Sequence, residues 1–139
     1  MLSISKEFRF DAAHRLCRPE LSPEENQALY GKCASLHGHS YTLQLTVSGE
    51  LDASGMIINF TELKQLGKAL ILDRYDHANL NELPEYAEIP VTAENMVRHI
   101  FSTLSPVLSQ KGLRLVQVRL YETPDSWATM TAEPAAQPS

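Results

Sequence analysis

The fold is decided by residues 36–48, which read LHGHSYTLQLTVS. The odd positions of this stretch are His, His, Tyr, Leu, Leu and Val, whereas the even positions are mostly Gly, Ser, Thr and Gln. An alternation of period two is typical of a strand that buries one face. The stretch therefore predicts a strand whose buried face begins with two histidines, His37 and His39.

Other segments of the chain predict further strands. Residues 2–10 alternate in the same way, and the shared parity continues through Ala12 to His14. Residues 113–122 read LRLVQVRLYE, and WATMT at 127–131 follows a turn, which predicts a hairpin. The apolar run MIINF at 56–60 predicts an antiparallel partner for residues 36–48.

Two longer segments space their apolar residues as helices do. The first follows Thr61, which predicts an N-cap, and the second begins at Thr92 and reaches Pro106, which predicts its end or a kink. A short helix is also predicted after Ser22, with Pro23 as its first residue. The apolar positions of the longer helices are Leu63, Leu66, Leu70, Met96, Val97, Ile100, Phe101 and Leu104.

The order of elements is a strand, a strand pair, two helices and a strand pair. This order favours an α+β fold, in which an antiparallel sheet carries two helices on one face. A chain of 139 residues with 43% hydrophobic residues fits one domain. We expect that domain to cover residues 1–131 and residues 132–139, AEPAAQPS, to be a disordered tail.

The charge of the chain excludes one class of function and bears on its location. A net charge of −5 argues against a general nucleic-acid binder, because such proteins neutralise phosphates with clustered Lys and Arg. The first ten residues carry three charges and no long apolar run, so we expect a cytoplasmic protein. In that compartment Cys17 and Cys33 are expected to be free thiols.

Three histidines predict a metal site. Residues two apart in a strand point the same way and lie about 7 Å apart, so His37 and His39 can share one ion. His14 can supply a third nitrogen from a neighbouring strand. Three imidazoles with an open fourth position are typical of catalytic zinc, whereas structural zinc has four protein ligands. The alternative is that the pair are ordinary strand residues, but unpaired imidazoles on a buried face are costly.

Other residues are candidates for proton transfer and for substrate binding. Cys33 lies four residues before His37 and could act as a thiolate base, although a lone cysteine is more often a small buried hydrophobe. Asp76 could orient His77 for proton transfer, but adjacent residues in a loop need not touch. Glu122 ends a strand and could accept two N–H groups from a heterocycle such as a pterin.

The motifs together resemble one family, the 6-pyruvoyltetrahydropterin synthase and 6-carboxy-tetrahydropterin synthase family. The resemblance runs from about residue 3 to residue 131. It rests on FDAAHRL at 10–16, Cys33 followed by LHGHSY at 36–41, GMIINFTELK at 55–64, DHANLN at 76–81, TAEN at 92–95 and YET at 121–123.

The resemblance implies a fold and an assembly. The fold is the tunnelling fold, with a four-stranded antiparallel sheet, two helices on one face and the order ββααββ. Its subunits form a homohexamer of two trimers, with the active sites at the subunit interfaces.

The resemblance also implies residue roles. His14, His37 and His39 match the zinc ligands, Cys33 matches the base, and Asp76 with His77 matches the rest of a catalytic triad. Three further residues match positions that bind the substrate, namely Glu122 as the pterin anchor, Thr92 and Glu94. Relatives usually carry Ser or Thr at the position of Ala93, so one hydrogen bond in the pocket is expected to be missing.

The substrate implied by the resemblance is 7,8-dihydroneopterin triphosphate, and the reaction is that of a zinc-dependent lyase. The three residues between Cys33 and His37 match the bacterial carboxy branch, which serves queuosine biosynthesis and releases acetaldehyde as well as triphosphate. LSPEEN at 21–26, GKC at 31–33 and Asn59 look more like the pyruvoyl branch. The prediction is the carboxy branch.

Two other classes of function stay open on the residues alone. They are a zinc hydrolase that uses metal-bound hydroxide and a pterin-binding module without catalysis. Arg15, Lys32 and Arg74 are candidate triphosphate contacts by charge and position. No role is predicted for His99, Cys17 or Trp127.

Overall fold

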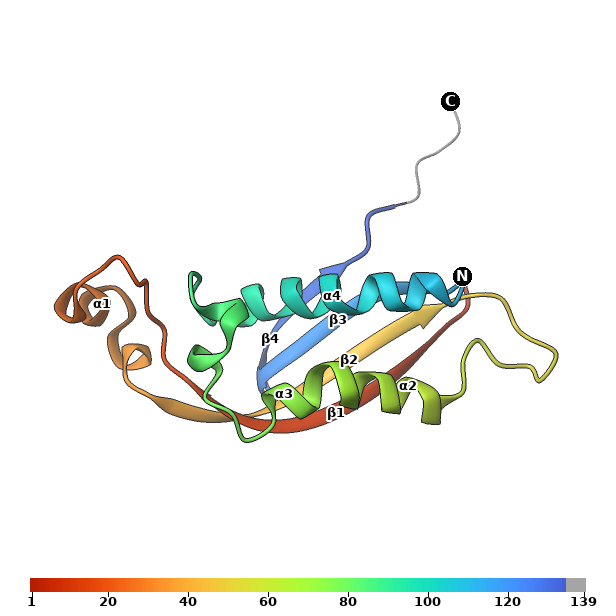
Figure 1. Ribbon diagram of the computed structural model, residues 1–139, viewed down its shortest axis with the longest axis horizontal. Coiled ribbons are helices and arrows are strands. Elements are labelled where there is room, and N and C mark those ends of the chain that lie inside the picture. The colour runs from red at the N-terminus through yellow and green to blue at the C-terminus, as the bar shows by residue number, and fades with distance from the viewer. Residues whose placement is uncertain (135–139) are drawn as a thin grey trace, which may run out of the picture.

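The histidine-bearing strand lies inside a four-stranded antiparallel sheet. In the computed structural model, which describes residues 1–134, the strand is β2, His37–Ser48. The sheet order is β1-β2-β3-β4, so each strand pairs with its neighbour in sequence (Figure 1). The other strands are β1 Ser3–His14, β3 Arg114–Thr123 and β4 Ser126–Thr131. The predicted fold class is confirmed.

The register of the sheet brings its histidines to one end. His14, the last residue of β1, pairs with His37, the first residue of β2, and Ala12 pairs with His39. Side chains of one parity in these strands, such as Leu43 and Leu45, are fully buried. The histidines continue this buried row at the point where the strands end, because the side chains of a strand alternate between its faces.

Helices cover one face of the sheet. They are α2, Phe60–Gly67, which runs through a π-helical turn at Lys68–Leu72 into α3, Asp73–Tyr75, and α4, Ala93–Gln110 (Figure 1). Thr92 caps α4 as predicted. The helix does not end at Pro106, because Leu104 and Leu108 on either side of the proline are both buried in the core.

Two local predictions around residues 56–61 are wrong. The run 56–60 forms no strand, because β2 already pairs with β1 on one edge and with β3 on the other. Ile57 and Ile58 instead bury their side chains in the core. The cap of α2 is Asn59 rather than Thr61, since the Asn59 side chain accepts the N–H of Thr61 at 2.8 Å.

A small lobe between β1 and β2 projects beyond the sheet at the left of Figure 1. It contains α1, Pro23–Tyr30, and a 3-10 turn at Gly31–Ala34. Ser22 caps α1 in a full capping box with Glu25, as its position before Pro23 predicts. Further 3-10 turns at Leu80–Glu82 and Pro84–Tyr86 connect α3 to α4.

The ends of the described chain bear on two further predictions. The last strand ends at Thr131, where the domain boundary is predicted, and residues 135–139 of the predicted tail lie outside the described residues. Within residues 1–134, no helix is both long enough and apolar enough to cross a membrane.

Candidate metal centre and its surroundings

The side chains of His14, His37 and His39 converge at the end of β1 and β2. One ligand atom from each lies within 4.8 Å of the other two. The rings of His14 and His37 meet edge to face with centroids 4.6 Å apart, and those of His37 and His39 are 4.9 Å apart. Two adjacent strands thus bring three imidazole nitrogens together in a group that could hold a metal ion.

Backbone carbonyls orient two of the three rings. His14 Nδ1 lies 2.7 Å from the carbonyl oxygen of Val91, and His37 Nδ1 lies 2.7 Å from that of Ser35. A carbonyl only accepts, so each Nδ1 carries the proton and donates it. The lone pair is then on Nε2, and metal-binding histidines are typically oriented in this way.

Two of the Nε2 atoms are buried and form no hydrogen bond in the described part of the chain. His14 is 1% exposed, and its Nε2, like that of His39, has no hydrogen-bond partner within residues 1–134. A buried polar atom without a partner costs about 1–3 kcal/mol, so a structure rarely keeps two of them side by side. The residues therefore fit a metal ion.

The electrostatics favour the neutral imidazoles that a metal needs. Burial lowers the pKa of His14, an effect that the Val91 carbonyl partly offsets and that nearby His37 reinforces. Burial also lowers the pKa of His39, and this outweighs the opposing charge of Glu122. Both rings are therefore neutral at pH 7 and can coordinate without first losing a proton.

Glu122 and Tyr41 form the wall beside the three histidines. A carboxylate oxygen of Glu122 lies 3.5 Å from His39 Nε2, and the Glu122 side chain is 31% exposed. Tyr41 is 1% exposed, and its hydroxyl has no partner within residues 1–134. Burial, and then the charge of Glu122, raise the pKa of Tyr41, so its hydroxyl stays protonated. The Glu122 side chain is thus partly exposed to solvent beside the histidines.

Cys33 is exposed, on the 3-10 turn just before β2. The alternative that it is a small buried hydrophobe is therefore wrong. Its carbonyl oxygen accepts the N–H of Leu16 at 2.7 Å, so the turn lies beside the segment that follows His14. The lobe around it is held by buried Asn26, whose side chain accepts from the N–H of Arg18 and donates to three carbonyl oxygens.

Asp76 and His77 do touch, although adjacent loop residues need not. Asp76 Oδ1 lies 3.0 Å from His77 Nδ1 and also accepts the backbone N–H of Asp11 at 3.0 Å. The His77 side chain is 80% exposed. The pair lies on the outer edge of β1, and within residues 1–134 no hydrogen bond or ion pair joins it to Cys33 or to the three histidines.

The start of α4 lies next to His14, because Val91 directly precedes the cap. The Thr92 hydroxyl accepts the N–H of Asn95 at 3.1 Å and thus has a structural role as the N-cap. Glu94 is exposed in the first turn of the helix. Ala93 is 9% exposed and brings no polar atom to this corner.

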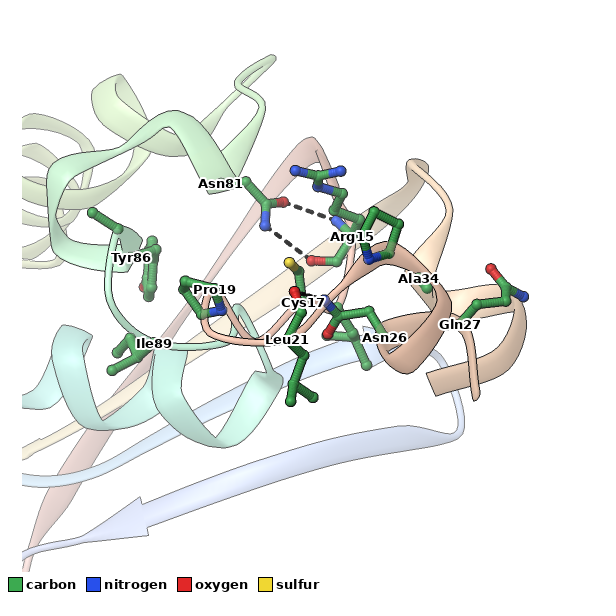
Figure 2. A pocket seen from close by; sticks show the side chains of 13 residues that line it. Arg15, Cys17, Pro19, Leu21, Asn26, Gln27, Ala34, Asn81, Tyr86 and Ile89 are labelled. Carbon is green, nitrogen blue, oxygen red and sulfur yellow. Dashed lines mark hydrogen bonds between the residues drawn. The ribbon is translucent and has the colours of Figure 1, made fainter. Parts of the chain in front are cut away.

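The three cations that could meet a triphosphate differ in their surroundings. Arg74 is bound to Glu85 by three hydrogen bonds of 2.5, 2.7 and 3.2 Å, so this guanidinium is already occupied. Lys32 is exposed on the turn that carries Cys33. Arg15 lies on the wall of a cavity of about 510 Å³ between the lobe and the loop before α4, shown in Figure 2.

Two elements of the site have no counterpart among the predicted residues. The carbonyl groups of Val91 and Ser35 act through the backbone, which no side-chain pattern reveals. The amide of Asn81 binds the backbone of Arg15, directly after His14 (Figure 2). Asn81 belongs to the DHANLN stretch. Its contact with Arg15 becomes visible only in the three-dimensional structure, because the two residues are far apart in the sequence.

The chain is similar to known proteins over most of its length. The family model described as 6-pyruvoyl tetrahydropterin synthase matches residues 3–133. The 6-pyruvoyl tetrahydrobiopterin synthase of Drosophila melanogaster is 40% identical over 125 residues, which cover 87% of this chain and 74% of that protein. The 6-carboxy-5,6,7,8-tetrahydropterin synthase of Haemophilus influenzae is 36% identical over 149 residues, covering 91% of this chain and 96% of that protein.

A solved structure is similar over nearly the whole chain. The 6-pyruvoyl tetrahydropterin synthase of Caenorhabditis elegans superposes with a TM-score of 0.84 at 32% identity. The match covers 95% of this chain and 96% of that one. The likeness therefore extends through the sheet and both long helices.

Proposed function

Because the chain belongs to the 6-pyruvoyl tetrahydropterin synthase family, we propose that it is a zinc-dependent lyase that acts on 7,8-dihydroneopterin triphosphate. One observation carries the proposal. Three histidine nitrogens lie within 4.8 Å of one another, and two buried Nε2 atoms have no hydrogen-bond partner within residues 1–134. A pterin synthase of this family explains both the histidines and the surrounding carboxylates.

We assign the zinc to His14, His37 and His39, which leave its fourth position open to the substrate. When bound, the zinc supplies a Lewis acid that polarises a substrate oxygen and acidifies the neighbouring C–H group. Glu122 then anchors the pterin by accepting two of its N–H groups, as a carboxylate with two oxygens can. Its position 3.5 Å from His39 supports this role, because the anchored ring would lie beside the metal ligands.

Proton transfer is assigned to Cys33 and to the Asp76–His77 pair. The exposed Cys33 thiol, as thiolate, removes the proton from the substrate carbon. Asp76 holds the His77 ring through its 3.0 Å contact, so that the imidazole can receive and return protons. Thr92 and Glu94 are assigned to the rim of the pterin pocket, where Ala93 adds no hydrogen bond.

The position of the pair supports an active site shared between subunits. His77 lies on the outer edge of β1 and is largely exposed, and within residues 1–134 no hydrogen bond or ion pair joins it to the three histidines. In a homohexamer of two trimers, which the family resemblance implies, a neighbouring copy can bring its pair to this cluster. The proposed catalytic set is then completed only by assembly.

For the product we propose 6-carboxy-tetrahydropterin, formed with loss of triphosphate and acetaldehyde, as in queuosine biosynthesis. The support is the short connection of three residues between Cys33 and His37, the spacing of the carboxy branch. Ser35 in that connection orients His37, so the spacing bears directly on the site.

A specific observation favours a second product, the pyruvoyl compound. The Drosophila relative, named for that activity, is more similar to this chain than the Haemophilus relative, at 40% against 36% identity. The pyruvoyl reaction stops after triphosphate loss and internal redox, so the two products share every residue assigned above.

The test is incubation of the zinc-loaded protein with 7,8-dihydroneopterin triphosphate, with the products identified by mass and acetaldehyde assayed. Acetaldehyde with the carboxy product supports the proposal, and the pyruvoyl product without acetaldehyde replaces it with the second candidate. Release of inorganic phosphate alone, with the pterin side chain intact, would mean a hydrolase. An unchanged substrate that nevertheless binds would mean a pterin-binding module.

A further inference from the structure

The outer edge of β1 is covered at its histidine end by the segment 76–81, which we call the edge strap. The N–H of His77 donates to the carbonyl oxygen of Asp11 at 2.6 Å, and the N–H of Ala13 donates to that of Ala78 at 2.9 Å. Asp76 accepts the N–H of Asp11 through its side chain. The strap thus replaces the neighbour strand that β1 lacks on this side.

Asn81 closes this strap with its side chain. Its Oδ1 accepts the backbone N–H of Arg15 at 2.8 Å, and its Nδ2 donates to the carbonyl oxygen of Arg15 at 3.0 Å (Figure 2). One amide therefore pairs with a backbone as a strand residue would. The paired residue directly follows His14, whose side chain points into the metal centre.

The same strap holds His77 in an unfavourable backbone conformation. His77 has φ of 62°, and it is the one described residue other than glycine with a positive φ within residues 1–134. Such a conformation persists only where the surroundings fix it, and its cost is of the order of 1–3 kcal/mol. Here the bonds of His77 to Asp11 and of Ala78 to Ala13 fix the strap at and directly after His77, and the Asn81 pair fixes it three residues further along.

We propose that Asn81 is a positioning residue that fixes the metal ligand His14 and the Asp76–His77 pair relative to each other. Its side chain binds the strap to β1 at Arg15, directly after His14. The backbone bonds at Asp11 and Ala13 bind the strap to the part of β1 before His14. Without Asn81 the last turn of the strap detaches, the end of β1 frays, and the strained backbone at His77 relaxes. The inference rests on the proposed function only for the identity of the metal.

The test compares Asn81→Ala with Asn81→Asp and with the control Asn59→Ala in the full-length, zinc-loaded protein. Asn59 likewise binds a backbone group through its side chain, as the N-cap of α2, and it lies outside the strap. The first readout is amide hydrogen exchange at Ala13 and His77, whose own acceptors the substitution does not remove. The second readout is the rate of zinc transfer to a chelator, which needs no turnover.

In Asn81→Ala we expect exchange at both amides and zinc release to be at least about tenfold faster, as for other residues that orient a metal ligand. Asn81→Asp keeps the acceptor for the Arg15 N–H but places a second oxygen against the Arg15 carbonyl, so its effect is intermediate. Asn59→Ala lowers the unfolding free energy without changing either readout.

Unchanged exchange at Ala13 and His77 in Asn81→Ala overturns the inference, and so does unchanged zinc release from a variant that binds zinc. If Asn81→Ala does not fold, Asn81→Asp is compared with Asn59→Ala by the same two measurements. Faster amide exchange and zinc release in Asn81→Asp alone then support the inference, and equal rates in the two variants overturn it. A wild-type protein that takes up no zinc contradicts the proposed function instead, and amide exchange then decides the inference alone.

Discussion

His14 shows how a single residue can be specified by its backbone surroundings. It is 1% exposed, its Nδ1 is fixed by Val91, and its Nε2 faces two other imidazoles. Nothing about the residue type distinguishes it from His99, which lies in the middle of α4. The difference lies in what each ring can reach.

We expect His14→Ala to lose most of its zinc, because two imidazoles alone hold the ion far more weakly than three. Elemental analysis of the purified variant measures this, against about one zinc per chain in the wild type. The matched control is His99→Ala, which removes an imidazole that lies against Tyr86 and Thr103. Equal zinc content in His14→Ala and the wild type would contradict the ligand assignment.

Cys33→Ala is expected to abolish turnover and to leave the zinc content unchanged, since the thiol is assigned as the base and not as a ligand. Product formation and zinc content measured on the same sample check both halves. Cys17→Ala is the matched control, because Cys17 is the other free thiol and lies on the cavity wall without a catalytic assignment. Near-normal activity in Cys33→Ala would refute the assignment.

Glu85 provides a test in which pH is the variable. Burial by itself would raise the pKa of Glu85, but the hydrogen bonds and charge of Arg74 outweigh it and lower the pKa below the usual 4.5. Stabilisation by the pair is then complete above pH 4.5 and is lost as the pH falls through the folded-state pKa. We expect Glu85→Gln to lower the unfolding free energy by about 1–2 kcal/mol at pH 7.

The difference between the wild type and Glu85→Gln should shrink as the pH falls from 5 to 3, because the wild-type carboxylate then becomes protonated. Denaturant unfolding of both proteins at several pH values measures it. Lys68→Ala is a control, since Lys68 pairs with Asp73 on the exposed surface and should change stability little. A difference that stays constant down to pH 3 would contradict the pairing.

At the residue scale the sequence predicts the three histidines of the site well. It predicts poorly the groups that orient these histidines. Strand parity alone aligns His37 with His39, and the shared parity of residues 8 to 14 puts His14 on the same face. The carbonyls that orient the rings, and the amide of Asn81, cannot be predicted in this way. They depend on which loops close over the end of β1, and hence on the packing of distant segments.

At the scale of elements, α2 lies unusually close to β1. A Cβ atom added at Gly67 would come within 2.5 Å of the ring of Phe8, whose side chain is 6% exposed. The glycine thus permits the helix to approach the strand, and a π-helical turn follows it directly. The approach sets where the helix continues into Asp76 and His77.

Gly67→Ala is therefore expected to lower the unfolding free energy by about 1–3 kcal/mol, although alanine is the better helix former. Chemical denaturation measures the loss. The double variant Gly67→Ala with Phe8→Leu should show a favourable interaction energy between the two changes, because the smaller side chain makes room. Additive effects of the two substitutions would show that the close approach is not what matters.

The elements themselves were largely predictable because most of them have one buried face. β2 and the helix from Thr92 show a clear period, and the bounds of β2 and the start of the helix agree closely with the prediction, whereas the helix continues past Pro106. The run 56–60 shows why apolar residues alone mislead. Ile57 and Ile58 are buried, as in a strand, but both edges of β2 were already taken by more distant strands.

At the scale of the whole molecule, the sheet has two edge strands, β1 and β4, each of which pairs with one other strand in the described part of the chain. Within residues 1–134, the part of β1 before Asp11 has β2 on one side and no strand on the other, and β4 likewise pairs only with β3. Trp127 on β4 lies against the ring of Tyr121, with centroids 5.2 Å apart, and is still 52% exposed. Unpaired strand edges of this kind commonly pair with another chain.

We expect the protein in solution to have six times the 15.5 kDa mass of one chain, as the family resemblance implies. Light scattering coupled to gel filtration measures the mass. Trp127→Glu places a charge on the exposed edge strand and should shift the mass toward smaller species, whereas Glu20→Gln on the lobe serves as the control. A monomer that turns over substrate would contradict the shared active site.

The whole-molecule level is where the sequence says least by itself. The order of elements is enough for the sheet and its helices, because each connection joins neighbouring strands. The position of the Asp76–His77 pair relative to the histidine cluster could not be inferred from the sequence, because it depends on where the strap crosses the edge of β1. Assembly likewise depends on surfaces that a periodic pattern does not describe.

Within residues 1–134 the buried Nε2 atoms of His14 and His39 have no hydrogen-bond partner, and this bears on how much of the protein a cell contains. A metal that satisfies them stabilises the folded chain over the unfolded one by mass action. The empty form is then the one that opens more often and that proteases remove first. A shortage of zinc would therefore lower the abundance of the protein, and the molecules that survive would be the active ones.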